Sequence, residues 1–246
     1  VTSCVPGEGK SSVSVALAES IADMGKSVIL VDADIRKSVM ASRLQITGAD
    51  KGLSHFLSGQ CVLADVIMAT NIPKFHILLS GPEAPNPTEL LESKRFTGML
   101  ESMKNVYDYI IIDGMPSLGM LTINEMTAAD SVLIPTQPQY YASDGLTELL
   151  KVYKATKARF NPKMEIEGIL YTMDVSRYNN SKRNKKAIKA AYGNELRIFN
   201  DSIPRLEPIS EAASEGVSIF TYEKNGKGAE SYQKLAQEVL NHAKEK

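Results

Sequence analysis

Residues 1–12 read VTSCVPGEGKSS, and this stretch decides the fold. A short run with β-branched residues leads into a turn rich in proline and glycine, and Gly9, Lys10 and Ser11 then open a helix with apolar periodicity. Glycines let successive backbone N–H groups approach an anion, and a helix N-terminus adds partial positive charge. The layout predicts a phosphate-binding loop made of Pro6, Gly7, Glu8, Gly9, Lys10, Ser11 and Ser12.

The loop departs from the usual phosphate-loop pattern at one position. That pattern has a glycine five residues before the second glycine, and here the residue is Cys4. Only a variant form of the motif therefore fits. Within it, Lys10 is expected to reach the β- and γ-phosphates, and the Ser11 hydroxyl is expected to bind Mg²⁺. A tight turn with a helix cap would explain Gly7 and Gly9, but not the lysine and serine that follow.

The composition is that of an ordinary globular protein. The 246 residues are 43% hydrophobic and 23% charged, enough for one large α/β domain or two small ones. A net charge of −1 gives no bulk attraction to nucleic acid or membranes, so such binding would need a local patch. Cys4 and Cys61 have no metal-ligand spacing, which favours a reducing cytoplasm, and no apolar run is long enough to span a membrane. The strand before the loop begins at Val1, which favours a fragment of a longer chain.

Strands and helices alternate along the sequence. Apolar runs predict strands over 27–34, 75–81, 107–117, 131–137 and 165–173, with a short one near 196–199. Helical periodicity predicts helices over 12–25, 53–58, 88–105, 122–129, 143–160, 180–192 and 228–243. Without a linker or a repeat, this order predicts one α/β domain over 1–246. Its sheet would be doubly wound and mostly parallel, with helices on both faces.

Acidic residues follow two of the predicted strands. Asp32 and Asp34 end one strand, and Asp113 ends another in the Walker B layout. Ligands of parallel sheets bind at the carboxyl ends of strands, and Mg²⁺ prefers one or two carboxylates together with phosphates. A lone aspartate after a strand is usually a cap or a turn residue. Three of them in a chain with a phosphate loop predict a site for a metal and a nucleotide.

These motifs resemble those of the deviant-Walker P-loop ATPases, the ParA/MinD superfamily. Residues 1–115 are similar to the bacterial tyrosine kinases of capsule and exopolysaccharide synthesis, through VTSCVPGEGKSS, VDADIRKS and GPEAPNPTELLESKRF. Residues 116–246 are similar to the ParA partition ATPases, through PSLGMLTINEMTAADSVLIPTQPQYYASDGL, IEGILYTMDVSR, IPRLEPISEA and KGAESYQKLAQEV. Because both families share a strand that ends in Asp and Pro, the chain resembles a crossover between them near 113–120.

The resemblance implies an ATPase that uses ATP and Mg²⁺. It implies that Lys10 and Ser11 bind the phosphates and the metal. Asp34 matches the acid that orients the attacking water, Asp32 supports the metal shell, and Asp113 matches the Walker B acid. Because phosphoryl transfer depends mostly on positioning and charge stabilisation, no other base is invoked.

The ParA-like half adds expectations about the base and the partners. Pro204 and Arg205 stand where ParA-like proteins have a loop beside the adenine. The resemblance also implies an ATP-dependent homodimer and an activating partner protein.

The sequence lacks one distinctive part of each family. ParA-like proteins carry a signature lysine near the start of the loop, and Val5 stands there. The kinases end in a tyrosine-rich tail, and the tail here has Tyr232 alone, in a helical pattern typical of core packing.

A basic patch without acids lies between residues 177 and 189. Nonspecific binding to the phosphate backbone of DNA needs such a cluster of positive charges and no contacts to the bases. ParA-like proteins bind nonspecific DNA through basic residues in this region, although Pro208 stands where they commonly have an arginine. DNA binding and a plain solvated helix face both stay open. The basic residues are Arg177, Lys182, Arg183, Lys185, Lys186 and Lys189.

Three functions follow from these observations. The leading one is a ParA-like nucleotide switch in DNA partitioning. The second is a protein-tyrosine kinase that acts on another chain, and it rests on Val5 and the kinase-like first half. The third is a nucleotide-binding scaffold with little turnover.

Overall fold

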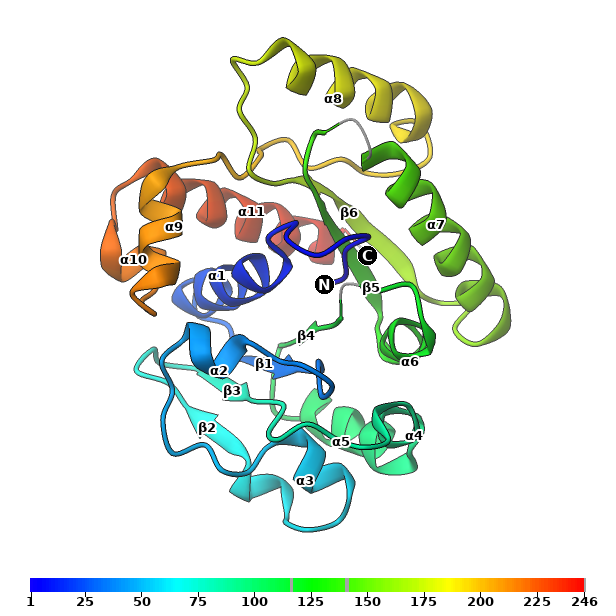
Figure 1. The fold of residues 1–246 in the computed structure, drawn as a ribbon, viewed down its shortest axis with the longest axis vertical. Coiled ribbons are helices and arrows are strands. Elements are labelled where there is room, and N and C mark those ends of the chain that lie inside the picture. The colour runs from blue at the N-terminus through cyan, green and yellow to red at the C-terminus, as the bar shows by residue number, and fades with distance from the viewer. Residues whose placement is uncertain (116, 140–141, 246) are drawn as a thin grey trace.

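The structure is a computed structural model that describes residues 1–115, 117–139 and 142–245. Strands and helices alternate along it, and the strands of its sheets are mostly parallel, with helices packed on both faces (Figure 1). The predicted α/β class is therefore confirmed.

Four strands form the larger sheet, in the order β2-β3-β1-β4. β1 is parallel to both of its neighbours, and β2 runs antiparallel to β3 at the edge. Asp32 at the end of β1 is in register with Asp113 at the end of β4. The register thus brings two of the predicted site acids together. The strands are β1 Val28–Asp32, β2 Ile67–Ala69, β3 Phe75–Leu78 and β4 Tyr109–Asp113.

The first two residues lie between this sheet and a second one, formed by parallel strands β5 (Ser131–Thr136) and β6 (Glu165–Tyr171). The nitrogen of Val1 donates to the carbonyl of Ile112, in β4, at 2.7 Å. The N–H of Thr2 donates to the carbonyl of Leu133 in β5 at 3.2 Å. The chain therefore enters the phosphate loop from a position between the two sheets.

Strand β1 is buried on both faces. Val28 and Leu30 belong to one apolar cluster, and Ile29 and Val31 belong to another. Successive side chains of a strand point to opposite faces, so a continuous apolar run is what a strand covered on both sides requires.

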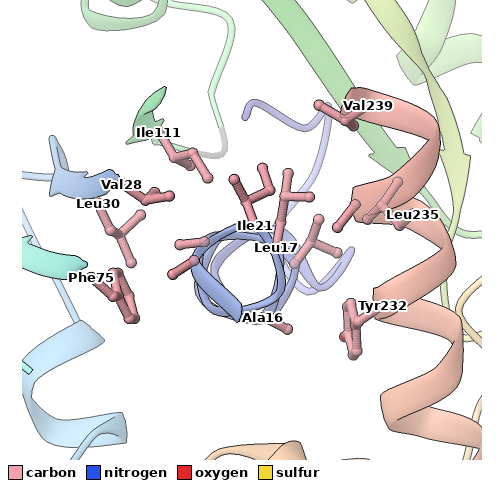
Figure 2. Packing of buried hydrophobic residues seen from close by; sticks show 14 of the residues in the cluster. Ala16, Leu17, Ile21, Val28, Leu30, Phe75, Ile111, Tyr232, Leu235 and Val239 are labelled. Carbon is pink, nitrogen blue, oxygen red and sulfur yellow. The ribbon is translucent and has the colours of Figure 1, made fainter. Parts of the chain in front are cut away.

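Helix α1 (Lys10–Asp23) covers the first face and is itself covered by α11 (Lys227–Lys244). Figure 2 shows Leu17 and Ile21 of α1 between Ile111 of β4 and Leu235 of α11. Full burial of such a side chain stabilises the fold by about 1.5–3 kcal/mol. Tyr232 of α11 is 3% exposed, as its helical pattern predicts. Helix α1, which carries the phosphate loop, is thus held from both sides.

The other helices cover the remaining faces. Three helices pack on the second face: α3 (Leu53–Leu57), α4 (Pro87–Glu92) and α5 (Lys94–Lys104). Three others pack around β5 and β6: α6 (Met120–Ala128), α7 (Ala142–Arg159) and α8 (Asn179–Tyr192). Short helices α2 (Met40–Arg43), α9 (Glu207–Ser214) and α10 (Ile219–Tyr222) lie near α1, and a 3₁₀ turn, η1, spans Leu63–Asp65. Over the described residues, we find no helix whose length and apolarity would let it cross a membrane.

The predicted helix over 88–105 is two helices. Ser93 has extended backbone angles, φ −69° and ψ 148°, and its side chain accepts a hydrogen bond from the N–H of Phe96. A serine that caps a new helix in this way ends the previous one. The first helix begins at Pro87, with Asn86 before it, one residue earlier than predicted. Proline is favoured in the first helical turn because it lacks the N–H that would be unsatisfied there.

The predicted strand near 196–199 is also wrong. At these residues the structure has one isolated β-bridge, between Ile198 and Ile169. A second isolated bridge, between Pro204 and Asp174, lies further along the chain. Residues 197–205 therefore run beside the end of β6 without becoming a regular strand. β2, α9 and α10 have no counterpart among the predicted elements. The other predicted helices and strands are confirmed, with ends that differ by a few residues, and residue 116 of the predicted strand over 107–117 lies outside the described residues.

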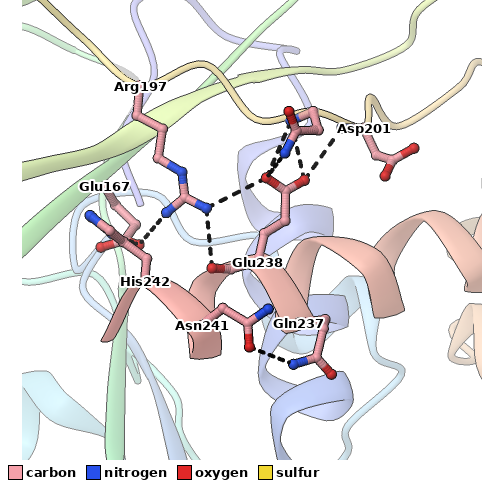
Figure 3. A network of polar contacts seen from close by, with 8 residues as sticks. Glu167, Arg197, Asp201, Gln237, Glu238, Asn241 and His242 are labelled. Carbon is pink, nitrogen blue, oxygen red and sulfur yellow. Dashed lines mark hydrogen bonds and ion pairs between the residues drawn. The ribbon is translucent and has the colours of Figure 1, made fainter. Parts of the chain in front are cut away.

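A polar network fastens residues 197–201 to α11 (Figure 3). Arg197 lies 3.5 Å from a carboxylate oxygen of Glu238 and 3.6 Å from Glu167. The N–H of Asn200 donates to Glu238 at 3.1 Å, and His242 lies 2.7 Å from Glu167. One end of this irregular segment is therefore fixed to α11.

Candidate functional site

The phosphate loop needs glycine at two positions. Gly7 has φ 86° and Gly9 has φ 81°, in the left-handed region that side chains with a Cβ disfavour. Helix α1 begins at the next residue, Lys10. The glycines thus turn the chain so that the first turn of α1 faces the loop. Val5, Pro6 and Gly7 are exposed, so the outer side of the loop is open to solvent.

The side chain of Glu8 points into the protein beneath the loop. It is buried, and its carboxylate accepts hydrogen bonds from the N–H groups of Cys4 at 2.9 Å and Val5 at 3.2 Å. The hydroxyl of Thr136 donates to its other oxygen at 2.9 Å. Burial raises the pKa of this carboxyl, and these hydrogen bonds oppose the change. Because the side chain of Glu8 is bonded inside the protein, only its backbone can contact a phosphate.

Two further residues hold the loop, and neither was predicted from the sequence. Gln137 donates from its side chain to the carbonyl of Gly7 at 2.8 Å, and the hydroxyl of Thr172 donates to the carbonyl of Glu8 at 2.8 Å. Both follow directly after strands of the second sheet, Gln137 after β5 and Thr172 after β6. Their position at a strand end is the signal that could have identified them.

Lys10 and Asp113 form a buried ion pair. Lys10 Nζ lies 2.8 Å from Asp113 Oδ1 and 3.4 Å from the hydroxyl of Ser11. The hydroxyl of Ser14 donates to the same carboxylate oxygen at 2.8 Å. The structure therefore brings the predicted lysine and serine of the loop together with the predicted strand-end acid, which is far from them in the sequence.

Asp32 lies next to this pair and is almost completely buried. Its carboxylate accepts hydrogen bonds from the hydroxyl of Ser38 and from the N–H groups of Ser80 and Asp34, the latter two at 3.3 Å. Burial raises the pKa of Asp32 to about 6, and the negative charge of Asp113 contributes. Two neighbouring acids are thus placed where a cation would favour their charged forms.

Replacing Asp32 should change how stability depends on pH. In the unfolded chain this carboxyl ionises near 3.8, and in the folded protein it ionises at about 6. Between these values the folded protein keeps a proton that the unfolded chain has lost, so the free energy of unfolding falls as pH rises. The full effect is on the order of 3 kcal/mol. We expect Asp32→Asn to flatten this slope in urea unfolding at pH 4, 5, 6 and 7.

The control for this measurement is Asp50→Asn, a change at an exposed aspartate. It should keep the wild-type slope. Because Glu19 and Glu125 also have raised pKa values, the comparison is between slopes over the same pH range. An Asp32→Asn slope equal to that of the wild type would contradict the assignment.

Asp34 lies on the outer side of this group. Its carboxylate accepts a hydrogen bond from the N–H of Lys37 at 2.9 Å, and the side chain is only partly buried. The N–H of Ala33 donates to the carbonyl of Asp113 at 3.0 Å, which holds the turn against β4. Asp34 therefore has an open side that a ligand or water can reach.

The oxygen atoms at this edge suit Mg²⁺ only in the presence of other ligands. Asp32, Asp113 and the hydroxyl of Ser11 offer the hard oxygen ligands that Mg²⁺ prefers. Over the described part of the chain, no group of three or more His, Cys, Asp and Glu residues could hold a metal by itself. The donor set fits Mg²⁺ that also binds phosphate oxygens and water.

Pro204 and Arg205 lie beside the end of β6. Pro204 is bridged to Asp174, and the N–H of Arg205 donates to the carbonyl of Asp174 at 3.1 Å. Arg205 lines a groove of about 260 Å³ together with Met173 and Arg183. A Cβ atom at Gly9 would lie 3.7 Å from the side-chain methyl group of Met173. The groove therefore adjoins the phosphate loop.

The structure divides the basic patch. Lys185 is half-buried and forms an ion pair with Asp174 at 2.6 Å, so it is committed to the fold. Arg177 stacks on Tyr178, and Arg183 lines the groove of Arg205 on another side of α8. The remaining three lysines are exposed and line one groove of about 650 Å³. They are Lys182, Lys186 and Lys189, and we call them the α8 lysine face.

Comparison with known proteins gives the class. Residues 5–166 match the family model AAA_31, described as an AAA domain. The chain is 37% identical to the sporulation initiation inhibitor protein Soj of Bacillus subtilis over 97% of its own length and 96% of that protein. It is 31% identical to the chromosome partitioning protein ParA of Caulobacter vibrioides over 98% of this chain and 92% of that protein.

Two further matches extend the comparison. The tyrosine-protein kinase CpsD of Streptococcus agalactiae is 43% identical over 139 residues, 56% of this chain and 60% of that protein. The septum site-determining protein MinD of Pyrococcus horikoshii, solved in complex with Mg-ADP, superposes with a TM-score of 0.80 over 98% of this chain and 96% of that one, at 24% identity. This last likeness establishes the fold alone.

The fold and the loop define a P-loop ATPase with alternating strands and helices. Among these, the chain belongs to the ParA/MinD superfamily, within the AAA_31 family. The predicted membership is confirmed, and a tyrosine kinase is among its relatives.

Proposed function

We propose that this chain is a Mg²⁺-dependent ATPase that acts as a nucleotide switch in DNA partitioning. The observation that carries the proposal is the position of Lys10, in the first turn of α1, 2.8 Å from Asp113 and beside Asp32. The match to Soj and ParA along nearly the whole chain supports it. The proposal treats residues 1–246 as one domain that works in the cytoplasm.

Each residue of the proposed site has one role. Lys10 holds the β- and γ-phosphates, while Ser11, Asp32 and Asp113 hold Mg²⁺ directly or through water. Bound Mg²⁺ would supply positive charge that offsets the charge of the phosphates. Asp34, on the open side, orients the water that attacks the terminal phosphate. The backbone N–H groups from Gly7 to Ser12 surround the phosphates.

The rest of the nucleotide would lie toward the groove of Arg205. Pro204 and Arg205 border the adenine in this proposal, because their loop adjoins Met173 and thereby the phosphate loop. The same proposal includes an ATP-dependent homodimer and an activating partner protein, as the ParA-like half of the sequence suggests. Val5 is exposed at the loop, where that family has its signature lysine.

We place nonspecific DNA on the α8 lysine face. Its three lysines are exposed on one groove, and DNA affinity comes mainly from contacts between cations and phosphates. Lys185 belongs to the predicted patch but is paired with Asp174, so it contributes structure. Arg177 and Arg183 would add to the field from neighbouring surfaces.

Reversing charge on this face should weaken DNA binding. We expect Lys182→Glu/Lys186→Glu to lower the affinity for a random DNA duplex by at least about tenfold at low salt with ATP and Mg²⁺. Fluorescence anisotropy with a labelled duplex measures the effect.

The matched control is Lys51→Glu/Lys94→Glu, which has the same change in net charge on exposed lysines of other elements. It should bind DNA like the wild type. Equal loss in both variants would mean that net charge alone is responsible, and no binding by the wild type would remove DNA from the proposal.

A protein-tyrosine kinase is the second candidate. CpsD of Streptococcus agalactiae, which is named a tyrosine-protein kinase, is 43% identical over 139 residues. Under this alternative the kinase-like part, residues 1–115, would be joined near 113–120 to a ParA-like part. Tyr232 is buried in the core, so an acceptor tyrosine would have to come from elsewhere.

One assay separates these functions. ATP labelled on the γ-phosphate is incubated with the protein, with and without DNA, and free phosphate and phosphotyrosine are measured in the same samples. We expect free phosphate without phosphotyrosine. Phosphotyrosine would instead establish the kinase, and nucleotide binding without either product would leave a scaffold with little turnover.

A further inference from the structure

Three residues after β6 contact three parts of the molecule. Thr172 donates from its hydroxyl to the carbonyl of Glu8, in the phosphate loop, at 2.8 Å. Asp174 contacts the segment that contains Pro204 through its main chain and helix α8 through its side chain. Residues 172–174, which we call the connector, therefore link the phosphate loop, the loop of Arg205 and α8.

The main chain of Asp174 fixes the loop of Arg205. Its N–H donates to the carbonyl of Ile203 at 3.0 Å, and its carbonyl accepts from the N–H of Arg205 at 3.1 Å. These two hydrogen bonds hold Pro204, which lies between Ile203 and Arg205, beside Asp174. The far end of the same segment is bound to Glu238 of α11 (Figure 3).

The side chain of Asp174 fixes α8. Oδ1 accepts from the hydroxyl of Ser181 at 2.6 Å, and Oδ2 accepts from Lys185 at 2.6 Å. Ser176 and Ser202 also donate to Oδ2, at 2.7 and 2.8 Å. The side chain is fully buried. Four donors come close to saturating a carboxylate, so this group is a fixed point of the fold.

The groups around this carboxylate favour its ionised form. Burial alone would raise its pKa, but the hydrogen bonds from Lys185 and the three serines outweigh burial and lower the pKa to about 2. Breaking the pair would leave a buried charge without a partner, which is costly. The ion pair with Lys185 thereby ties the middle of α8 to Asp174.

The middle residue of the connector has an unusual backbone conformation. Met173 has φ 48°, in the left-handed region that residues other than glycine rarely adopt. The side chain of Gln137 donates to the carbonyl of Gly7 and lies 3.2 Å from the sulfur of Met173. Such a conformation persists only where the surroundings impose it, and it is commonest at functional sites.

We propose that Asp174 is a positioning residue that couples the nucleotide site to the α8 lysine face. A shift of the loop of Arg205 toward a bound base, or of the phosphate loop toward phosphates, reaches Asp174 through the connector. The carboxylate passes the shift to Ser181 and Lys185 in α8. The inference rests on the nucleotide binding proposed above, and it adds the route by which that binding reaches the lysines.

The coupling acts in both directions. If ATP changes the affinity of the α8 lysine face for an anion, that anion must change the affinity for ATP by the same factor. Typical couplings between two sites are about 5- to 150-fold.

Hydrogen exchange of α8 tests the coupling without DNA. We expect ATP with Mg²⁺ to change the exchange of α8 amides in the wild type by about fivefold or more, the lower end of typical coupling. In Asp174→Asn, which keeps the shape and loses the charge, ATP should bind with an affinity within about threefold of the wild type. The response of α8 should then be absent.

Asp201→Asn is the matched control. It is the same chemical change in the same segment, but Asp201 is exposed and lies 3.9 Å from Lys234 of α11. This variant should keep the wild-type response of α8. Should Asp174→Asn fail to fold, Ser181→Ala removes one bond between the connector and α8 and leaves the ion pair with Lys185 in place, and it should reduce the response.

The outcomes separate this inference from the proposed function. A wild type that binds ATP without a response in α8, or a full response in Asp174→Asn, overturns the coupling and leaves the ATPase proposal standing. If Asp174→Asn does not fold, a full response of α8 in Ser181→Ala overturns the coupling in the same way. A wild type that binds no ATP, measured with a fluorescent ATP analogue in the same samples, overturns both.

Discussion

Lys10→Ala should lower the affinity for ATP by at least about 100-fold, because the buried ammonium is the main cation of the proposed phosphate site. Titration with a fluorescent ATP analogue in the presence of Mg²⁺ measures the loss. The change should also abolish hydrolysis, since a nucleotide that is not held cannot be positioned for attack.

The same substitution should destabilise the protein. Removing Lys10 leaves the carboxylate of Asp113 buried without its partner, and breaking a buried pair typically costs about 3–5 kcal/mol. A double variant, Lys10→Met/Asp113→Asn, removes both charges and should recover most of the stability without recovering ATP binding. Urea unfolding gives the comparison.

This pair of variants separates folding from binding. If the double variant is stable and still binds ATP like the wild type, Lys10 is not the phosphate ligand. Lys94→Ala, at an exposed lysine of α5, serves as the control and should change neither quantity.

Asp34→Ala should lower the rate of ATP hydrolysis by about 10²–10⁴-fold and leave ATP affinity within about threefold, since a positioned acid–base group contributes an effect of this size. The structure places Asp34 on the open side of the site, while Asp32 and Asp113 are enclosed. A group that acts only on the attacking water affects turnover without affecting binding.

Phosphate release and nucleotide titration, measured on the same preparation, check this prediction. Asp50→Ala is the control, a change at an exposed aspartate. Because Asp34 accepts a hydrogen bond from the N–H of Lys37, Asp34→Asn is a second variant that keeps an acceptor for that turn. Normal hydrolysis in Asp34→Asn would show that the charge of Asp34 has no part in the reaction.

The sequence predicted the parts of the site that lie in short motifs. Lys10, Ser11, Asp32 and Asp113 stand in runs of a few residues whose type and spacing have a physical reason, and the structure brings all four together. The ion pair between Lys10 and Asp113 joins residues about one hundred positions apart. Spacing along the chain carries no information on such a contact, so it had to come from the fold.

The features that the sequence did not predict have the same origin. A count of charges assigns Lys185 to a binding patch, but Asp174 lies in another element and takes this lysine into the fold. The sequence places Glu8 in the loop without indicating where its side chain points, and that side chain is buried and hydrogen-bonded to Cys4, Val5 and Thr136. Apolar periodicity predicts one continuous helix over 88–105. It does not show the extended backbone of Ser93, whose side chain caps a second helix by accepting a hydrogen bond from the N–H of Phe96.

The position of Glu8 determines when the phosphate loop acquires its shape. Its carboxylate occupies the N–H groups of Cys4 and Val5 from inside, so the loop is held by an anion that belongs to the protein. Fixing the backbone of each residue costs about 1–2 kcal/mol in conformational entropy. For this loop, the backbone loses that conformational entropy when the protein folds, before any ligand binds. A triphosphate would therefore meet a loop that already has its shape and can shift as a unit, and its association rate would be limited by encounter and not by loop ordering.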